Sequence, residues 1–434
     1  MRVKLLAGLG LGLAVALALA SVEVGAQTAA QTAPPPSSAL VGLVDDYVKS
    51  GKVSGIVVGI GRGDAPPLFL AGGKLAFEDN APPANADSLW RVYSMTKPIT
   101  GMAAMMLVED GKIRLDQPVS DFIPAFKDVR VLDDPAGKTL ASHPAKHPIT
   151  IRNLLTHTAG LGYNIITQGP LLDEYNRLGI NPAQLGAAME PQMRAVRAPS
   201  LQAFADRVAT LPLIAEPGSK WSYSIGLDVM GRVIEVASGM PFDTFLQKRI
   251  FDPLKMQSTW FTVPPSAAGR LATNYYYAGQ ARLPIDPGAT SLWLTPPSFP
   301  YGGAGLVSSA SDYDRFLHML LNGGQLDGVR VMKPETVRLA MSDLLPAGTD
   351  TSMLHLVTGF AGKIGFGAGG SVYLEDAPGA ASKGTYGWAG AAGTLAWVDP
   401  VRRVRGVIMV NYMPTEHWPL RSDLNKAFVA DMIR

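Results

Sequence analysis

Residues 94–110 (SMTKPITGMAAMMLVED) join a polar turn to an apolar segment that ends before Gly111. The pattern predicts a helix over 95–110, and a helix with so little polar surface is expected to be buried. Ser94 would stand at its start, beside free backbone N–H groups and the positive end of the helix dipole. Lys97 follows on the same face, so its amine can reach the Ser94 hydroxyl. Burial favours the neutral form of an amine, so this spacing suits a serine nucleophile with a basic partner.

The same motif also allows a purely structural interpretation. Ser94 could cap the helix, and Lys97 could extend its amine to solvent. In a chain of 434 residues, about one S-x-x-K motif is expected by chance. The catalytic interpretation therefore needs support from other segments.

Two other segments supply groups of the kind that such a nucleophile needs. Residues 221–225 (WSYSI) place Tyr223 just before a predicted helix, where its hydroxyl could pass protons to and from Ser94. Residues 388–391 (WAGA) precede a predicted strand, and small residues there let backbone N–H groups face a developing oxyanion. Each segment also has an ordinary explanation, an aromatic core residue and a Gly-rich turn.

Helical and strand patterns are distributed unevenly along the chain. Apolar residues at helical spacing predict helices at 39–49, 149–155, 201–210, 227–237, 311–321 (with Ser309 or Ser311 as the cap) and 420–433. Runs of β-branched and aromatic residues predict strands at 53–60, 68–71, 394–398 and 405–412. Residues 262–304, rich in Pro, Gly and aromatic residues, are predicted to form long ordered loops. Strands near both ends with helices between them indicate a sheet assembled from the termini and interrupted by a helical insertion.

The N-terminus has the features of a secretory signal. Positive residues at 2 and 4 precede an apolar run over 5–20 and small residues at 24–26, so residues 1–26 are predicted to be a cleaved signal peptide. The alternative is an uncleaved anchor, but a spanning helix needs about 20 apolar residues. Residues 27–38 are predicted to be a flexible lead-in. We expect an exported protein, periplasmic or secreted, with no stable membrane anchor after cleavage.

Composition excludes several classes of function. The chain has 38 basic and 36 acidic residues, a balance that would not attract nucleic acid. It has no cysteine, which excludes disulfides, thiolate metal sites and cysteine nucleophiles. His143 and His147 have metal-like spacing, but Pro144 lies between them and no H-E-x-x-H motif is present, so we predict neither a metal nor another cofactor. His157 is predicted to be structural, with a Ser–His general base as the alternative.

Four blocks of sequence around the S-x-x-K motif resemble the serine β-lactamase and penicillin-binding-protein superfamily. The resemblance runs from about residue 40 to the C-terminus and is greatest to the class C-like branch that includes the family VIII carboxylesterases. The blocks are 149–163 (ITIRNLLTHTAGLGY), 217–231 (PGSKWSYSIGLDVMG), 302–312 (GGAGLVSSASD) and 386–400 (YGWAGAAGTLAWVDP).

The resemblance implies an α/β (α+β) fold in which an antiparallel sheet is flanked by helices and joined to a mostly helical second lobe. The catalytic domain would span 39–434, with the sheet lobe at about 39–93 and 305–434 and the helical lobe at about 94–304. It implies that Ser94 is the acylated nucleophile, Lys97 its basic partner and Tyr223 the tyrosine of the second motif. The backbone N–H groups of Ser94 and Ala391 would form the oxyanion hole. Whether Lys97 or Tyr223 takes the first proton stays open, since two groups so close titrate together.

Two departures from the β-lactamase pattern bear on the substrate. Ile225 stands where β-lactamases of this branch carry asparagine, and Trp388-Ala389-Gly390 replaces their Lys-Thr-Gly. Both missing groups normally engage the lactam side chain and carboxylate, so recognition of an anionic substrate should be weak. The residues predicted to line the substrate pocket are Trp388, Ala389, Gly390, Tyr163 and Tyr301, with Tyr93 and Trp221 as further candidates.

These features predict a serine hydrolase that works through an acyl-enzyme on a small-molecule ester or lactam. The apolar Trp388 favours a carboxylesterase for short-chain or neutral esters. A β-lactamase or D-alanyl-D-alanine carboxypeptidase-like enzyme is the alternative. A non-catalytic binding relative is the third hypothesis, and the intact set of Ser94, Lys97 and Tyr223 argues against it.

Overall fold

The computed structural model describes residues 38–359, 362–377 and 381–432. The predicted signal peptide (1–26) lies outside the described residues, as does all but the last residue of the predicted lead-in (27–38). Within the described ranges, none of the helices combines the length and apolar character that crossing a bilayer requires.

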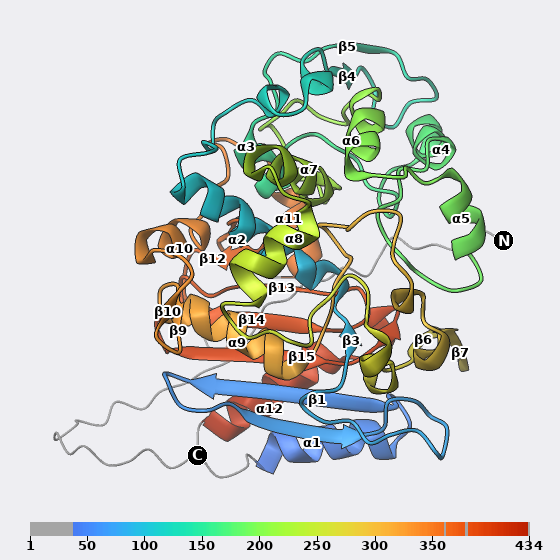
Figure 1. The fold of residues 1–434 in the computed structure, drawn as a ribbon, viewed down its shortest axis with the longest axis vertical. Coiled ribbons are helices and arrows are strands. Elements are labelled where there is room, and N and C mark those ends of the chain that lie inside the picture. Colours follow the sequence, from blue (N-terminus) through green and yellow to red (C-terminus); the bar gives the residue numbers. More distant parts are fainter. Residues whose placement is uncertain (1–37, 360–361, 378–380, 433–434) are drawn as a thin grey trace.

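A seven-stranded antiparallel sheet is the centre of the fold (Figure 1). Its strands, in spatial order, are β11 (Ile364–Phe366), β12 (Ser371–Tyr373), β13 (Tyr386–Ala389), β14 (Leu395–Asp399), β15 (Val404–Met409), β1 (Gly55–Arg62) and β2 (Leu68–Gly73). The N-terminal strand β1 pairs with the C-terminal strand β15, with Val57 opposite Met409. Because β1 lies inside the sheet, its β-branched residues are almost all buried. The prediction of a sheet assembled from both ends of the chain is confirmed.

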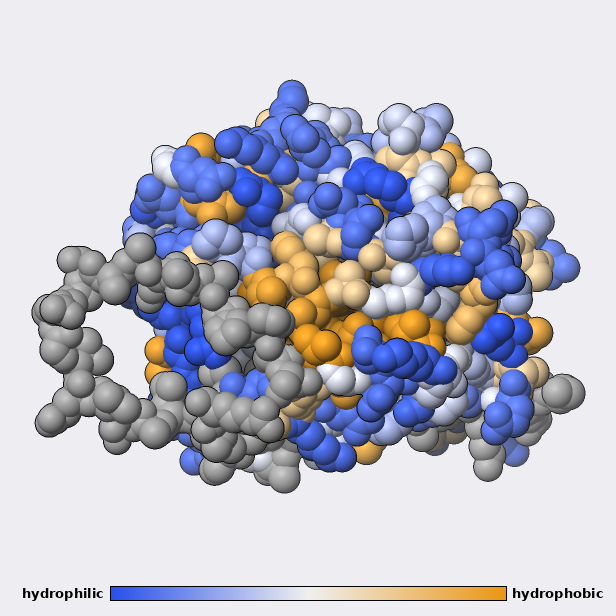
Figure 2. Space-filling model, turned by 90° about the horizontal axis from the view of Figure 1, so that it is seen from below, coloured by the Kyte–Doolittle hydropathy of each residue, from blue (hydrophilic) through white to orange (hydrophobic). Residues whose placement is uncertain are grey.

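Helices cover both faces of this sheet. The terminal helices α1 (Ser38–Lys49) and α12 (Leu420–Met432) lie together on one face, where Trp397 of β14 packs edge-on against Phe428 at 5.3 Å. Helix α9 (Ala310–Leu321) covers the opposite face and is capped by the Ser309 side chain. Seen from the side of α1 and α12, an apolar strip runs between charged side chains (Figure 2). Val41 of α1 is 38% exposed.

A mostly helical lobe lies above the sheet in Figure 1. Its members are α2 (Thr96–Glu109), α3 (Ile151–Leu155), α4 (Gly169–Arg177), α5 (Glu190–Val196), α6 (Leu201–Ala209), α7 (Gly226–Ser238) and α8 (Phe242–Leu246), with α10 (Pro334–Ala340) and α11 (Ser352–Thr358) beside it. Every residue of α2 from Thr96 to Leu107 is buried, as its apolar sequence predicts. Helix α7 packs on α2, α3, α6 and α8. The predicted fold class, an antiparallel sheet with flanking helices and a helical second lobe, is confirmed.

The loop prediction for 262–304 was wrong in its central part. This segment contains the hairpin of β6 (Asn274–Ala278) and β7 (Ala281–Asp286), joined by β16 (Tyr412–Met413) in a three-stranded sheet. The predicted strand 405–412 accordingly divides between β15 and β16. Asn411 lies between them, and its side chain bonds the backbone N–H and C=O of Arg91 at 3.1 Å each. The shorter pairs are β3 (Trp90–Arg91) with β8 (Val307–Ser308), β4 (Arg130–Leu132) with β5 (Ser142–Pro144), and β9 (Gln325–Leu326) with β10 (Val329–Arg330).

Candidate active site

Ser94 lies in a 3₁₀ turn, Tyr93–Met95, between strand β3 and helix α2. Tyr93 has a φ of +42°, which is unusual for a residue with a side chain and costs on the order of 1–3 kcal/mol. Neighbouring groups hold it there: Asn274 donates a 3.0 Å hydrogen bond to the Tyr93 hydroxyl, and Trp293 packs edge-on against its ring. The strained residue immediately before Ser94 is thus fixed by contacts from distant segments.

The structure brings Ser94, Lys97 and Tyr223 together. Lys97 Nζ lies 3.1 Å from Ser94 Oγ, and the Tyr223 hydroxyl donates to the same oxygen at 2.6 Å. Ser94 is 5% exposed and Lys97 is fully buried, so the interpretation of Lys97 as a solvent-exposed side chain is wrong. The capping interpretation of Ser94 is also wrong, because α2 begins at Thr96 with Met95 at its N-cap and without a side-chain cap.

Trp388 of β13 lies against the side of Tyr223. Its indole N–H points to the Tyr223 oxygen at 3.3 Å, so that oxygen stands between Trp388 and Ser94. Trp388 is fully buried. Other aromatic rings surround the Tyr223 ring, namely His157 at 4.9 Å, Tyr163 at 5.4 Å and Trp221 at 6.2 Å between ring centres. The predicted pocket residues Trp388, Tyr163 and Trp221 therefore share one aromatic cluster around Tyr223.

His157 supports the tyrosine motif from behind and does not contact Ser94. Its Nδ1 accepts the backbone N–H of Ser224 at 3.2 Å and lies 2.9 Å from the Ser224 hydroxyl. Since Nδ1 is an acceptor there, the proton of the neutral ring resides on Nε2. Burial, and then the charge of Lys97, hold the pKa of His157 well below its usual value. The alternative of a Ser–His general base is therefore contradicted, and His157 positions Tyr223 through its neighbour.

The end of β13 lies directly beside the turn that carries Ser94. A Cβ on Gly390 would meet the Val92 carbonyl oxygen at 2.4 Å, so only glycine allows this approach. Within the described residues, the backbone N–H groups of Ser94 and Ala391 donate to no protein acceptor. Ala389 is buried, whereas Ala391 is partly exposed. Two free N–H groups in such neighbouring turns are what the predicted oxyanion hole requires.

Tyr301 contacts a different set of residues from the other predicted pocket residues. Its fully buried ring packs edge-on against Phe299 at 4.8 Å, and the Arg197 guanidinium lies 5.5 Å from it. Tyr301 immediately precedes the Gly302-Gly303 pair, and the Gly303 carbonyl accepts a hydrogen bond from Lys97.

Asp228 and Gly303 were missed as site residues by the sequence reasoning. Lys97 Nζ donates to the Gly303 carbonyl at 2.8 Å, and the Gly303 N–H donates to Asp228 Oδ1 at 2.8 Å. Asp228 is fully buried, and burial raises its pKa to about 7, while the Lys97 charge and the Gly303 N–H act in the opposite direction. Both residues lie inside the sequence blocks that resemble the family. For Asp228, the sequence feature that could have indicated a functional role was a carboxylate at the start of an otherwise apolar helix.

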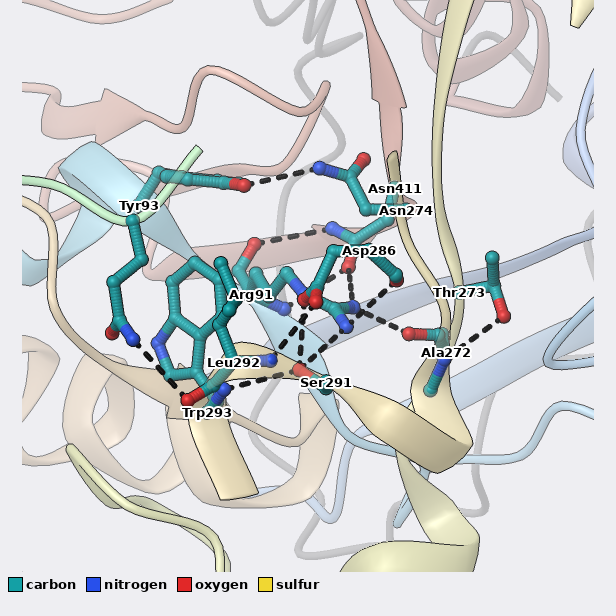
Figure 3. Close-up of polar contacts among 12 residues, drawn as sticks. Arg91, Tyr93, Ala272, Thr273, Asn274, Asp286, Ser291, Leu292, Trp293 and Asn411 are labelled. Carbon is teal, nitrogen blue, oxygen red and sulfur yellow. Dashed lines mark hydrogen bonds and ion pairs between the residues drawn. The ribbon is translucent and has the colours of Figure 1, made fainter. Parts of the chain in front are cut away.

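Arg91, three residues before Ser94, is the centre of a buried polar network (Figure 3). Its guanidinium bonds the Asp286 carboxylate at 2.5 Å, the Asp286 carbonyl at 3.0 Å and the Ser291 hydroxyl at 2.9 Å. It also donates to the Ala272 carbonyl and the Asn411 side chain. This network ties β3 to the 272–293 segment and to Asn411, and so holds the backbone that carries Ser94.

His143 has carboxylate neighbours on both sides of its ring. Its Nδ1 lies 2.6 Å from Asp133 and its Nε2 3.3 Å from Glu216, and hydrogen bonds to these carboxylates raise its pKa. Over the ranges that the structure describes, His, Asp and Glu side chains form no group of three suited to a metal ion. His143 is therefore an ion-pair residue of the β4–β5 hairpin.

Comparisons with known proteins agree with this architecture. The β-lactamase family model matches residues 40–429. The protein Rv1367c of Mycobacterium tuberculosis is 38% identical over 77% of this chain and 80% of its own length. Esterase EstB of Burkholderia gladioli is 30% identical over 85% of this chain and 88% of its own length. The structure of EstCE1, described as a hydrolase with promiscuous acyltransferase activity, superposes with a TM-score of 0.72 at 26% identity, covering 90% of this chain and 97% of EstCE1.

The match covers the sheet, the helical lobe and the segments that carry Ser94, Lys97 and Tyr223. The four sequence blocks that resemble the family lie within the matched residues, which extend over both lobes. The chain belongs to the β-lactamase family of serine hydrolases.

Proposed function

We propose that the protein is a carboxylesterase that hydrolyses short-chain or neutral esters through an acyl-enzyme on Ser94. In the proposed reaction, Ser94 Oγ attacks the ester carbonyl carbon, and the Ser94 proton passes to the Lys97–Tyr223 pair. The N–H groups of Ser94 and Ala391 bind the oxyanion. The carbon–oxygen bond to the alcohol then breaks, and the alcohol takes the proton. Water attacks the acyl-enzyme, which releases the acid and regenerates Ser94.

The contact between Trp388 and Tyr223 is the observation that carries this proposal. Trp388 stands at the position of the lysine in the Lys-Thr-Gly of β-lactamases, and it offers a neutral N–H to Tyr223 in place of an ammonium group. Ile225, at the asparagine position, is fully buried. A substrate carboxylate would therefore lack the cation and the amide that bind it in β-lactamases. A neutral ester needs neither group. The relatives EstB, described as an esterase, and EstCE1, described as a hydrolase, support hydrolysis of an ester.

Parallel turnover of p-nitrophenyl butyrate and a chromogenic cephalosporin tests the proposal. The protein beginning at Gln27 should cleave the ester far faster than the cephalosporin, and Ser94→Ala should abolish ester cleavage above the background rate. Efficient cephalosporin cleavage would favour the β-lactamase or D-alanyl peptidase alternative and refute the argument from Trp388. Equal ester turnover by Ser94→Ala would remove Ser94 from the mechanism.

We also propose that the protein is exported and loses residues 1–26. The charged start, the apolar run and the small residues before Gln27 support this. Expression of the full chain in a Gram-negative host should give a periplasmic or secreted product whose intact mass begins at Gln27. A cytoplasmic product that retains Met1 would contradict the proposal.

A further inference from the structure

The Gly302-Gly303 pair passes between helices α2 and α7 and is bonded to both. The peptide group that joins the two glycines is held from opposite sides: Thr100 Oγ1 of α2 donates to the Gly302 carbonyl at 2.7 Å, and Asp228 Oδ1 of α7 accepts the Gly303 N–H at 2.8 Å. A Cβ on Gly303 would lie 2.6 Å from Asp228 Oδ2, and a Cβ on Gly302 would lie 2.4 Å from the Leu227 carbonyl oxygen. The two hydrogen bonds orient this peptide group, and the close packing leaves no room for a side chain at either glycine.

The Gly303 carbonyl belongs to the next peptide group, Gly303–Ala304. The Ala304 N–H of that group donates to the Tyr301 carbonyl at 3.3 Å, and the Gly303 carbonyl faces Lys97. It accepts one N–H bond of Lys97 at 2.8 Å, while Lys97 Nζ lies 3.1 Å from Ser94 Oγ. A neutral amine has two N–H bonds and one lone pair. With one N–H bond held by Gly303, rotation of the amine is restricted, and its lone pair can face the Ser94 proton.

Asp228 brings a carboxylate to the same buried region. It is fully buried, and its Oδ2 has no hydrogen-bond partner among the described residues. The titratable groups around it are Lys97 of α2, whose charge acts on Asp228, and Tyr163, whose own pKa is raised by burial, Tyr223 and Asp228. His157 is adjacent to Tyr223 and neutral, as argued above. The Lys97 amine and the Asp228 carboxyl group thus share a buried site.

We propose that Asp228 is a positioning residue with two effects: through Gly303 it orients the Lys97 amine toward Ser94, and its charge shifts the pH range in which Ser94 reacts. The inference rests on the proposed function, since it assigns Asp228 a role only if Ser94 is the nucleophile. The sign of the charge effect follows from electrostatics. A buried carboxylate stabilises a proton on a neighbouring group. Removing the Asp228 charge should therefore let the Ser94 proton leave at lower pH.

Asp228→Asn separates charge from shape, because its amide oxygen can still accept the Gly303 N–H. The matched control is Asp312→Asn on α9. Asp312 is also a buried carboxylate whose pKa burial raises, to about 6, and it accepts the Ser258 N–H at 2.6 Å and the Thr259 hydroxyl at 2.8 Å. The readout is the rate at which a fluorophosphonate labels Ser94 between pH 5 and pH 10, followed by intact mass, which does not depend on the natural substrate.

In the plot of Ser94 labelling rate against pH, the acid limb is the range over which the rate rises with pH. We expect the acid limb of Asp228→Asn to lie at lower pH than that of the wild type by about one unit or more. The Asp312→Asn profile should coincide with the wild type. Thr100→Val, which loses the bond to the Gly302 carbonyl but no charge, should lower the labelling rate at every pH without moving the acid limb. It also tests the positioning role if Asp228→Asn does not fold.

A folded Asp228→Asn protein with an unmoved acid limb would overturn the charge role, and wild-type labelling by Thr100→Val would overturn the positioning role. Failure of the wild type to be labelled at Ser94 would instead refute the proposed function. The two failures are therefore distinguishable.

Discussion

Replacing Arg91 with methionine removes the cation at the centre of the buried network behind the nucleophile turn (Figure 3). The Arg91 side chain is fully buried and donates to five acceptors, two of them on Asp286. Methionine keeps most of the length and apolar volume of the side chain but satisfies none of those acceptors. Asp286 would retain only the Ser291 hydroxyl and the Leu292 N–H, at 2.7 and 2.9 Å.

The magnitude follows from the burial of both partners. Stranding one member of a buried ion pair costs about 3–5 kcal/mol of unfolding free energy. The double variant Arg91→Met/Asp286→Asn removes the stranded charge, so it should be at least about 1 kcal/mol more stable than Arg91→Met alone. The turn that carries Ser94 loses its support as well. The strain at Tyr93, on the order of 1–3 kcal/mol, is then no longer held in place, and Ser94 labelling should slow by about tenfold or more.

Urea unfolding followed by tryptophan fluorescence gives the stability change, and fluorophosphonate labelling under folding conditions gives the reactivity. The matched control is Arg405→Met, which breaks another buried ion pair, with Asp314 at 2.8 Å on the α9 face of the sheet. It should lose comparable stability and keep the wild-type labelling rate. A loss below about 1 kcal/mol in Arg91→Met, or equal loss of labelling in both variants, would refute the reasoning.

Three further predictions concern groups around Tyr223 and Lys97. The pKa of Asp228 in the folded protein, about 7, lies above its usual value of 3.8, so ionisation of Asp228 destabilises the native state increasingly from about pH 4 to pH 7. Asp228→Asn should lack this pH dependence. Its unfolding free energy should therefore rise relative to the wild type by up to about 4 kcal/mol between pH 4 and pH 8, since a pKa difference of about 3 units corresponds to about 1.4 kcal/mol per unit. Urea stability curves that stay parallel for the two proteins over this range would contradict the prediction. Trp388→Phe keeps the ring but loses the N–H to Tyr223, and Ser94 labelling should slow about tenfold; an unchanged rate would show that this N–H is not needed. Gly390→Ala forces a Cβ to within 2.4 Å of the Val92 oxygen, so labelling should be lost while circular dichroism shows a folded protein; wild-type labelling would show that the turn can relax.

Local sequence determined the elements whose residues interact with near neighbours in the chain. The apolar run before Gly111 specified α2, and the β-branched run at 53–60 specified most of β1. Ser309, one of the two caps predicted for α9, is the cap that the structure shows. The S-x-x-K spacing also belongs here, since one helical turn brings Lys97 near Ser94 whatever surrounds it. Pairing of the terminal strands was anticipated because strand patterns occur at both ends of the chain.

Contacts between distant segments were decided by the tertiary structure. The hairpin of β6 and β7 was predicted as loop, because a Tyr-rich run followed by a Gly turn becomes a strand only when a partner such as β16 is available. Trp388 was predicted as a pocket wall from its place in the family resemblance, and only the fold shows that its N–H points to the Tyr223 oxygen.

Asp228 illustrates the physical reason most clearly. Helical periodicity places residues on a face, and it does so from local backbone geometry. Which buried carboxylate finds which N–H group depends on where two helices and a loop cross, and that is settled only when the whole core is packed. The sequence by itself therefore predicted Ser94 as the nucleophile with Lys97 as its partner, and it identified the family. The tertiary structure decided how the amine of Lys97 is held, through a glycine and an aspartate that lie far from it in the chain.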